Sequence, residues 1–104
     1  MLMSTTEDIP GKKVTEVLKI VMGNTVRAKW VGKDILAQLR NLVGGELKEY
    51  SDMLMEAREQ ALNRMIAEAE AIEADAVINV RFSTSQIVQR AAEILAYGTA
   101  VKLE

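Results

Sequence analysis

The sequence feature that most constrains the fold is a run of alternating residues between positions 13 and 29. Alternation of apolar and polar residues with a period of two is typical of a β-strand with one buried face. The apolar residues of this run fall mainly at even positions, which are Val14, Leu18, Ile20, Met22, Val26 and Ala28. We therefore predict a long strand over this run.

Gly23-Asn24, in the middle of the run, allows an alternative, because a Gly-Asn pair between apolar segments can form a two-residue hairpin turn. Such a hairpin would place Ile20 opposite Arg27 and so put a cation on the apolar face. A continuous strand keeps the apolar face in phase on both sides of Gly23. We therefore predict one continuous strand that is kinked or bulged at Gly23.

Two helices are predicted after this strand. A short helix covers residues 34–43 and stops at Gly44-Gly45, where a left-handed conformation ends it. A longer helix covers residues 51–74. Its apolar stripe, widened by Leu62 and Ile66, consists of Leu54, Ala57, Ala61, Met65, Ala69 and Ile72. The many alanines in this stripe allow a close approach to a sheet.

Period-two alternation returns in residues 76–82, where a second strand is predicted. The apolar face of this strand is predicted to hold Ile78, Val80 and Phe82. A polar loop is expected near residues 83–86, followed by a last strand over residues 93–103. The even positions of this last strand are small, which favours packing against the alanine-rich helix; they are Ala96, Gly98 and Ala100.

The predicted architecture is therefore a single α+β domain over residues 1–104, in the order β-α-α-β-β. The helices are expected on one face of a mainly antiparallel sheet. Residues 1–12 form a polar lead-in, in which Ser4-Thr5-Thr6 could pair as an edge strand before the turn at Pro10-Gly11.

Apolar residues are expected on both faces of this sheet, and one helical layer can cover only one face. The residues assigned to the side away from the helices are Val17, Val21, Leu95, Tyr97, Val101 and Leu103. An antiparallel sheet can expose one face to water, but such a face is usually polar. The sequence therefore predicts that the chain's partner is itself, in a homo-oligomer.

The composition excludes several kinds of chemistry. The chain has no cysteine and no histidine, which excludes histidine-dependent catalytic triads, Cys/His zinc sites and thiolate capture of soft metals. The net charge is −2 with both signs interspersed, so no nucleic-acid partner is expected. No run is apolar enough for a membrane span and no signal peptide is recognised, so we expect no membrane partner and a cytoplasmic location.

Carboxylates remain as candidate metal ligands, because carboxylate oxygens suit hard divalent cations. Glu46, Glu49 and Glu93 are the candidates, although solvated surfaces carry such residues in almost any protein. Arg81 is expected to need a carboxylate partner, and Glu93 could supply it across the last hairpin, within one chain or between subunits. We find no nucleophile–base combination, predict no catalytic residue, and rank an enzyme last.

Several motifs along the chain resemble those of the YbjQ-like family, which is named for heavy-metal binding and has no characterised function. In order they are VMGNTVR (21–27), RNLVGGE (40–46), Tyr50, EAR (56–58), ADAVINVRF (74–82) and EILAYGTAV (93–101). The resemblance covers nearly the whole chain after Lys13. It implies a small dodecin/YbjQ-like fold that assembles into a ring, typically a homopentamer.

The resemblance also points to particular residues. The family commonly has glycine where this chain has Glu73 and Asn79. The residues that match its polar signature positions could form a pocket or hold an interface; they are Glu46, Tyr50, Arg58, Arg81, Glu93 and Tyr97. The expected function is a non-enzymatic, homo-oligomeric small-ligand-binding or structural protein with no predicted cofactor. The alternative is a protein that binds a divalent cation through carboxylate oxygens.

Overall fold

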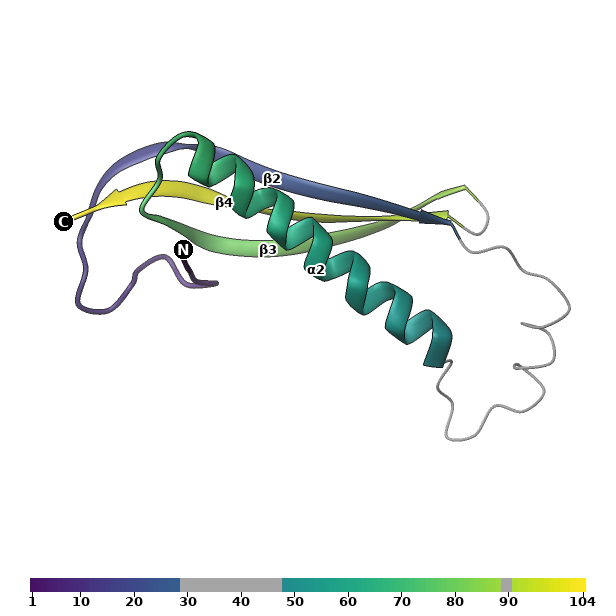
Figure 1. The fold of residues 1–104 in the computed structure, drawn as a ribbon. Helices are drawn as coiled ribbons and strands as arrows, with labels where there is room; N and C mark the ends of the chain where they lie inside the picture. Colours follow the sequence, from purple (N-terminus) through teal and green to yellow (C-terminus); the bar gives the residue numbers. More distant parts are fainter. Residues whose placement is uncertain (29–47, 89–90) are drawn as a thin grey trace, which may run out of the picture.

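The computed structural model describes residues 1–28, 48–88 and 91–104, with only the backbone for residues 28 and 48–50. One helix packs on one face of a mixed four-stranded sheet (Figure 1). The elements are β1 (Leu2–Met3), β2 (Val14–Ala28), α2 (Lys48–Ala71), β3 (Ala76–Val88) and β4 (Ala91–Leu103). The predicted α+β class is confirmed, whereas the short helix expected at residues 34–43 lies outside the described residues.

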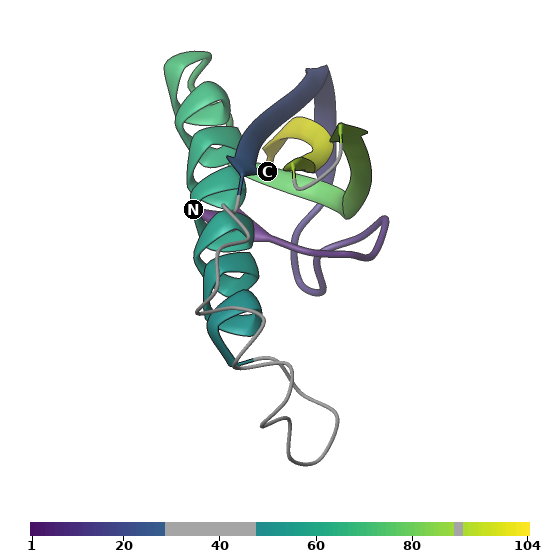
Figure 2. The same ribbon diagram turned by 90° about the vertical axis from the view of Figure 1, so that its right-hand side faces the viewer.

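The sheet has the strand order β1-β3-β4-β2. β4 pairs antiparallel with both β2 and β3, and β1 pairs parallel with the first residues of β3. Figure 2 views the strands of the twisted sheet roughly end-on, with α2 seen from its side on one face of the sheet. Among the described residues, no helix combines the length and the apolar character that crossing a membrane requires.

β2 is one continuous strand, as predicted, but it has no bulge at Gly23. The ladder runs regularly through the pair Gly23↔Ala96, and the register shifts lie earlier, between Val14 and Glu16 and between Val17 and Lys19. Gly23 instead marks the closest approach of the helix. A Cβ atom at this position would lie 2.3 Å from the Ala61 carbonyl oxygen and 2.3 Å from the Met65 nitrogen.

From Val21 onwards, the buried face of β2 is the odd-numbered one. Val21, Gly23 and Thr25 are buried beneath α2, whereas Ile20 and Met22 are exposed on the opposite face. The prediction that Val21 lies away from the helix was therefore wrong. The register shift between Val17 and Lys19 moves the alternation by one residue, so that Leu18 and Val21 both pack against the core. Gly23 then allows backbone contact with α2 that a larger side chain would prevent.

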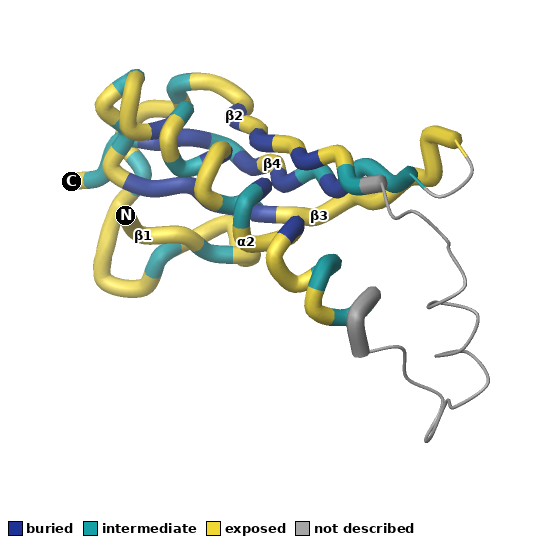
Figure 3. Tube along the Cα trace, turned by 45° about the vertical axis from the view of Figure 1, so that its right-hand side comes forward, coloured by how far each residue is buried: buried dark blue, intermediate teal, exposed yellow. Residues whose placement is uncertain are grey.

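The predicted stripe of α2 is confirmed. Its central residues have no exposed surface and pack against small residues of β4. Figure 3 marks buried positions in dark blue on both the helix and the sheet. These helix residues are Ala57, Ala61, Met65 and Ala69, and their partners on β4 include Ala96 and Ala100. The predicted pairing of a small-residue strand with an alanine-rich helix is the centre of the core.

β3 continues to Val88, so the polar loop predicted near residues 83–86 was wrong. The ladder passes from Ile78↔Thr99 to Arg81↔Tyr97, which leaves Asn79 and Val80 opposite one residue, Gly98. This bulge reverses the alternation. Val80 packs beneath α2 whereas Ile78 lies in a second cluster, so the prediction of one shared face for these two was wrong.

The second cluster is covered by the N-terminal segment. Ala76, Ile78 and Val101 form its buried part, and Ile9 packs over it. The backbone of residues 4–6 bonds to β3: Ser4 N–H donates to the Val77 carbonyl, and the N–H groups of residues 79 and 80 donate to the carbonyls of residues 6 and 4. Residues 4–6 thus bond to the edge of β3, but the edge strand is β1 at Leu2–Met3 and not the predicted Ser4-Thr5-Thr6. Both chain termini lie at the same end of the molecule (Figure 1).

The chain after α2 adopts a left-handed C-terminal cap. The Glu73 N–H donates to the Glu70 carbonyl and the Ala74 N–H to the Ala69 carbonyl, both at 3.0 Å. These two hydrogen bonds form the Schellman motif, whose left-handed residue is usually glycine. Here that residue is Glu73, with φ 57°, and the bulge residue Asn79 has φ 53°. Among the described residues, the two positions at which the resemblance leads us to expect glycine are thus the two non-glycine residues with a positive φ.

Replacing Glu73 by glycine should stabilise the fold, because a side chain in the left-handed region costs about 1 kcal/mol. Glu73→Gly is expected to raise the melting temperature by roughly 4–8 °C, measured by circular dichroism at fixed protein concentration. Asn79→Gly should gain less, since asparagine tolerates this conformation better. Glu73→Ala removes the charge and keeps the Cβ atom, so it should give no comparable gain; an equal gain would contradict this explanation.

Candidate functional site

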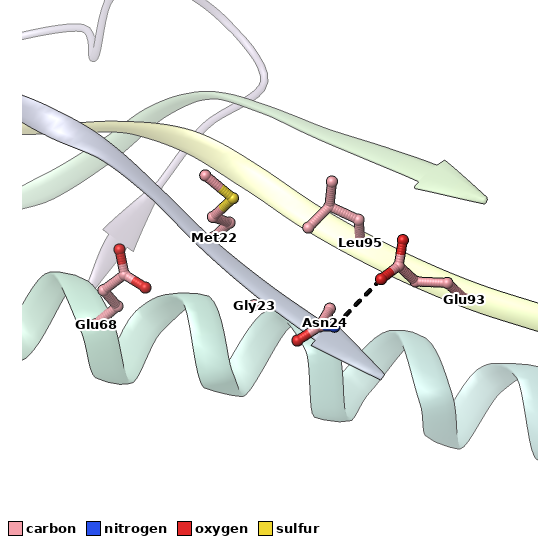
Figure 4. Close-up of a pocket in the computed structure, with 6 residues that line it drawn as sticks. All are labelled: Met22, Gly23, Asn24, Glu68, Glu93 and Leu95. Carbon is pink, nitrogen blue, oxygen red and sulfur yellow. Dashed lines mark hydrogen bonds between the residues drawn. The ribbon is translucent and has the colours of Figure 1, made fainter. Parts of the chain in front are cut away.

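An open hollow of about 440 Å³ lies along β2 and is the candidate site (Figure 4). β2 and β4 supply most of its lining, and α2 supplies one carboxylate. The lining residues are Met22, Gly23, Asn24, Glu68, Glu93 and Leu95. Alternation along β2 places Met22 and Asn24 on the exposed face, while glycine at position 23 leaves the strand without a side chain between them.

The two carboxylates of the hollow are already engaged within the chain. The Asn24 side-chain amide donates to Glu93 Oε2 at 3.2 Å, as Figure 4 shows. Lys19 Nζ lies 3.3 Å from Glu68 Oε1, with both side chains well exposed. An exposed ion pair of this kind contributes little to stability. The hollow is therefore polar and weakly acidic, with both carboxylates held at its rim.

A polar ridge on α2 fastens the helix to β2 beside the hollow. Gln60, Arg64 and Glu68 follow one another at intervals of four residues and so lie on one flank of the helix. Arg27 Nη2 donates to Gln60 Oε1 at 2.9 Å, and Arg64 Nη1 donates to the Asn24 carbonyl at 2.6 Å. Sequence reasoning missed this ridge; its signal is the four-residue spacing on the flank next to the apolar stripe.

The predicted site residues are distributed over the molecule. Glu93 lines the hollow. Arg81 and Tyr97 are direct neighbours across β3 and β4, on the sheet face away from α2. Arg58 is exposed on α2. The remaining candidates lie outside the described residues or have side chains that are not described; they are Glu46, Glu49 and Tyr50.

Within one chain, Arg81 does not pair with Glu93. In the ladder Glu93 lies opposite Ser85, four residues along β3 from Arg81. Arg81 Nη1 instead donates to the Thr5 carbonyl at 2.7 Å and to the Val80 carbonyl at 2.9 Å. The guanidinium therefore holds the N-terminal segment against the bulge of β3.

The donor set does not fit a soft heavy metal. The whole chain lacks the thiolate and imidazole ligands that such ions prefer. In residues 1–28, 48–88 and 91–104, no group of three acidic side chains is close enough to hold a metal ion. Oxygen ligands remain, and they suit hard cations.

Comparisons with known proteins agree with this architecture. A model of the YbjQ family, described as "Putative heavy-metal-binding", matches residues 1–104. The chain belongs to the YbjQ family. UPF0145 proteins are similar to it: one from Archaeoglobus fulgidus is 62% identical over 99% of this chain and 95% of its own. Another from Thermotoga petrophila is 59% identical over 100% of this chain and 98% of its own.

A solved structure of similar shape supports the fold. It is a protein of unknown function in the DUF74 family from Pediococcus pentosaceus, with a TM-score of 0.68 over 100% of this chain and 98% of that chain. Its sequence is only 14% identical, so the likeness concerns the fold alone. The predicted YbjQ-like resemblance is confirmed, and it brings no established activity with it.

Arg81 should be required for the order of the N-terminal segment. Arg81→Ala removes the donor to the Thr5 carbonyl, so the N–H groups of residues 4, 79 and 80 should exchange with solvent deuterium several-fold faster by mass spectrometry. Arg58→Ala, on the exposed face of α2, is the matched control and should leave this exchange unchanged. Equal exchange in both variants would show that Arg81 does not hold the segment.

Proposed function

We propose that this chain works as a homo-oligomer, a pentameric ring of structural or small-ligand-binding function without catalytic activity. The observation that carries the proposal is the sheet face opposite α2. Four large apolar side chains of β2 are between 49% and 65% exposed on this face. The aromatic side chain of Tyr97, which is 37% exposed, lies on β4 beside them. The four are Val17, Ile20, Met22 and Val26.

Apolar side chains adjoin one another across the exposed face. Met22 lies opposite Tyr97, Val17 lies opposite Val101, and Ile20 lies between these pairs along β2. The lead-in segment covers only the second cluster around Val101 and Ile78. A contiguous apolar surface of this kind is typical of a contact with another protein, and burial of such area is the main favourable term in association.

The small-ligand part of the proposal follows from the hollow. Asn24 and Glu93 place an amide and a carboxylate at its rim, beside the apolar surface of Met22 and Leu95. If this face turns towards a neighbouring copy, the hollow becomes a partly enclosed space between subunits. A polar ligand of modest size is the class that such a lining accommodates.

The oligomer is tested by multi-angle light scattering on a sizing column. The unaltered chain should elute at a multiple of its 11.5 kDa mass, with five copies expected. Met22→Asp puts a charge into the apolar face and should shift the mass towards one copy, because an unpaired charge is costly to bury. Asn63→Asp, on the exposed side of α2, is the control and should keep the parent mass. A clean monomer of the unaltered chain at micromolar concentration would rule out the proposal.

The second candidate function is binding of a hard divalent cation. The observation in its favour is the pair of carboxylates, Glu68 and Glu93, at one hollow with the Asn24 amide between them. The other two predicted carboxylate ligands, Glu46 and Glu49, lie outside the described side chains. Calorimetric titration with Ca²⁺ and Mn²⁺, and with Cd²⁺ as the soft-metal comparison, separates the candidates. Binding tighter than millimolar that Glu93→Gln weakens would favour this candidate, and its absence would end it.

A further inference from the structure

The two edges of the sheet carry unusually open strand segments. Along β2, residues 20–26 contain no charged residue and no proline. Along β3, residues 82–88 are likewise uncharged and without proline, and every residue from Arg81 to Val88 is exposed. Both segments are seven residues long, and each has a free backbone edge among the described residues, because β4 lies between them.

Edges of this kind are hazardous in a soluble protein. A strand edge presents unpaired N–H and C=O groups, and natural proteins usually protect it with charges, proline, bulges or a covering segment. The first part of each strand has such protection: β2 has its two register shifts, and β3 is covered by β1 and residues 4–6. Residues 20–26 have no register shift, and their edge is met by one side chain, since Arg64 donates to the Asn24 carbonyl. Residues 82–86 pair regularly with β4, and the irregularity between Gln86 and Val88 lies at the far end of the strand. Uncharged, β-prone segments of this length readily pair with other strands.

We propose that residues 82–88 of β3 in one copy pair with residues 20–26 of β2 in the next copy. The inference rests on the proposed homo-oligomer and names the surfaces that build it. The contact is head-to-tail, because it joins two different edges of the same sheet. Repetition of a head-to-tail contact gives either an open filament or a closed ring, and a closed ring leaves no free edge.

The orientation of this contact follows from the sheet. β2 and β3 both run antiparallel to β4 and therefore run in the same direction. A sheet that continues from copy to copy with every helix on the same face joins them as a parallel pair. Residues Ser83 and Ser85 then lie on the outer face beside Met22, since their partners on β4 share that face with the partner of Met22.

The position of α2 gives this contact a second component. The helix packs over β2, β4 and the first part of β3, and it leaves the helix-side surface of β3 uncovered beyond Val80. Phe82, opposite the buried Ala96, therefore stays 48% exposed. Joined to β2 of the next copy, Phe82 comes beside the polar ridge of that copy's α2. Arg64 of the ridge already donates to the Asn24 carbonyl, whose oxygen can accept a second bond.

Disulfide cross-linking tests the pairing directly, because the chain has no cysteine of its own. Eight double variants each carry one cysteine at an outer-face position of β2 and one at an outer-face position of β3. Together they sample the registers in which the two segments can align. The positions are Ile20, Met22, Asn24 and Val26 on β2, and Ser83 and Ser85 on β3. A disulfide within one chain is excluded, because β4 separates the strands by about 9–10 Å, beyond disulfide reach.

At least one double variant should give, after mild oxidation, a ladder of multiples of 11.5 kDa on a non-reducing gel that collapses on reduction. Its two single-cysteine variants should stay monomeric on that gel. Asn63→Cys on α2 combined with Ser85→Cys is the matched control and should give no ladder. Hydrogen exchange of the unaltered oligomer adds a second readout, in which N–H groups of residues 20–26 and 82–88 are protected and lose protection on dissociation.

Three results would overturn the pairing. Dimers from a β2 single-cysteine variant alone would indicate a two-fold contact between equal edges. If the oligomer is intact but none of the eight variants yields a ladder, the pairing is wrong and the homo-oligomer proposal still holds. A monomer of the unaltered chain in light scattering would rule out both the pairing and the homo-oligomer. Circular dichroism of each variant shows whether it has kept the fold.

Discussion

The contact between α2 and β2 at Gly23 is the constraint on which the rest of the structure depends. A helix normally rests on a sheet through side chains, but here its backbone lies against the strand, with alanines at the facing positions of α2. This contact fixes the helix over β2 and β4. The helix cannot also cover β3 beyond Val80, so the outer half of that strand remains exposed on both faces.

The position of α2 therefore determines both which residues form the core and which part of β3 stays exposed. The close contact brings α2 to the edge of the sheet, where Gln60, Arg64 and Glu68 reach β2. The free surfaces then lie elsewhere: the apolar outer face of the sheet and the outer edge of β3 at residues 82–88. The chain is well packed near the alanine stripe and exposed at its periphery, and this contrast underlies the proposed homo-oligomer.

Much of the fold could be predicted from the sequence where one local pattern dominates. The alanine stripe and the period-two run identified α2 and β2, because burial of one face leaves a regular imprint. Bulges were not predictable in this way. The bulge at Asn79 shifts the alternation of β3 by one residue, so Ile78 and Val80 lie on opposite faces although their spacing suggests one face. The exposed residues 83–86 were assigned to a loop because they are polar, whereas pairing with β4 holds them in a strand.

The candidate site was harder to predict, because its residues meet through the register of β2 against β4. Glu93 was recognised as a candidate, but its contact with Asn24 depends on a ladder that no spacing reveals. Arg81 was assigned a carboxylate partner on the ground of charge, yet its guanidinium donates to the carbonyl oxygens of Thr5, in the polar lead-in segment, and of Val80. Glu73 and Asn79 show the opposite case, since a motif comparison identified the positions that need an unusual backbone.

The placement of the two chain ends has a practical consequence. Both lie at the same end of an elongated molecule that measures 55 Å along its longest axis, and the hairpin of β3 and β4 points the other way (Figure 1). Fusions at either terminus would therefore project from one rim of the proposed ring and leave the opposite rim bare. An assembly of this kind would display attached cargo on a single side, as a one-sided scaffold.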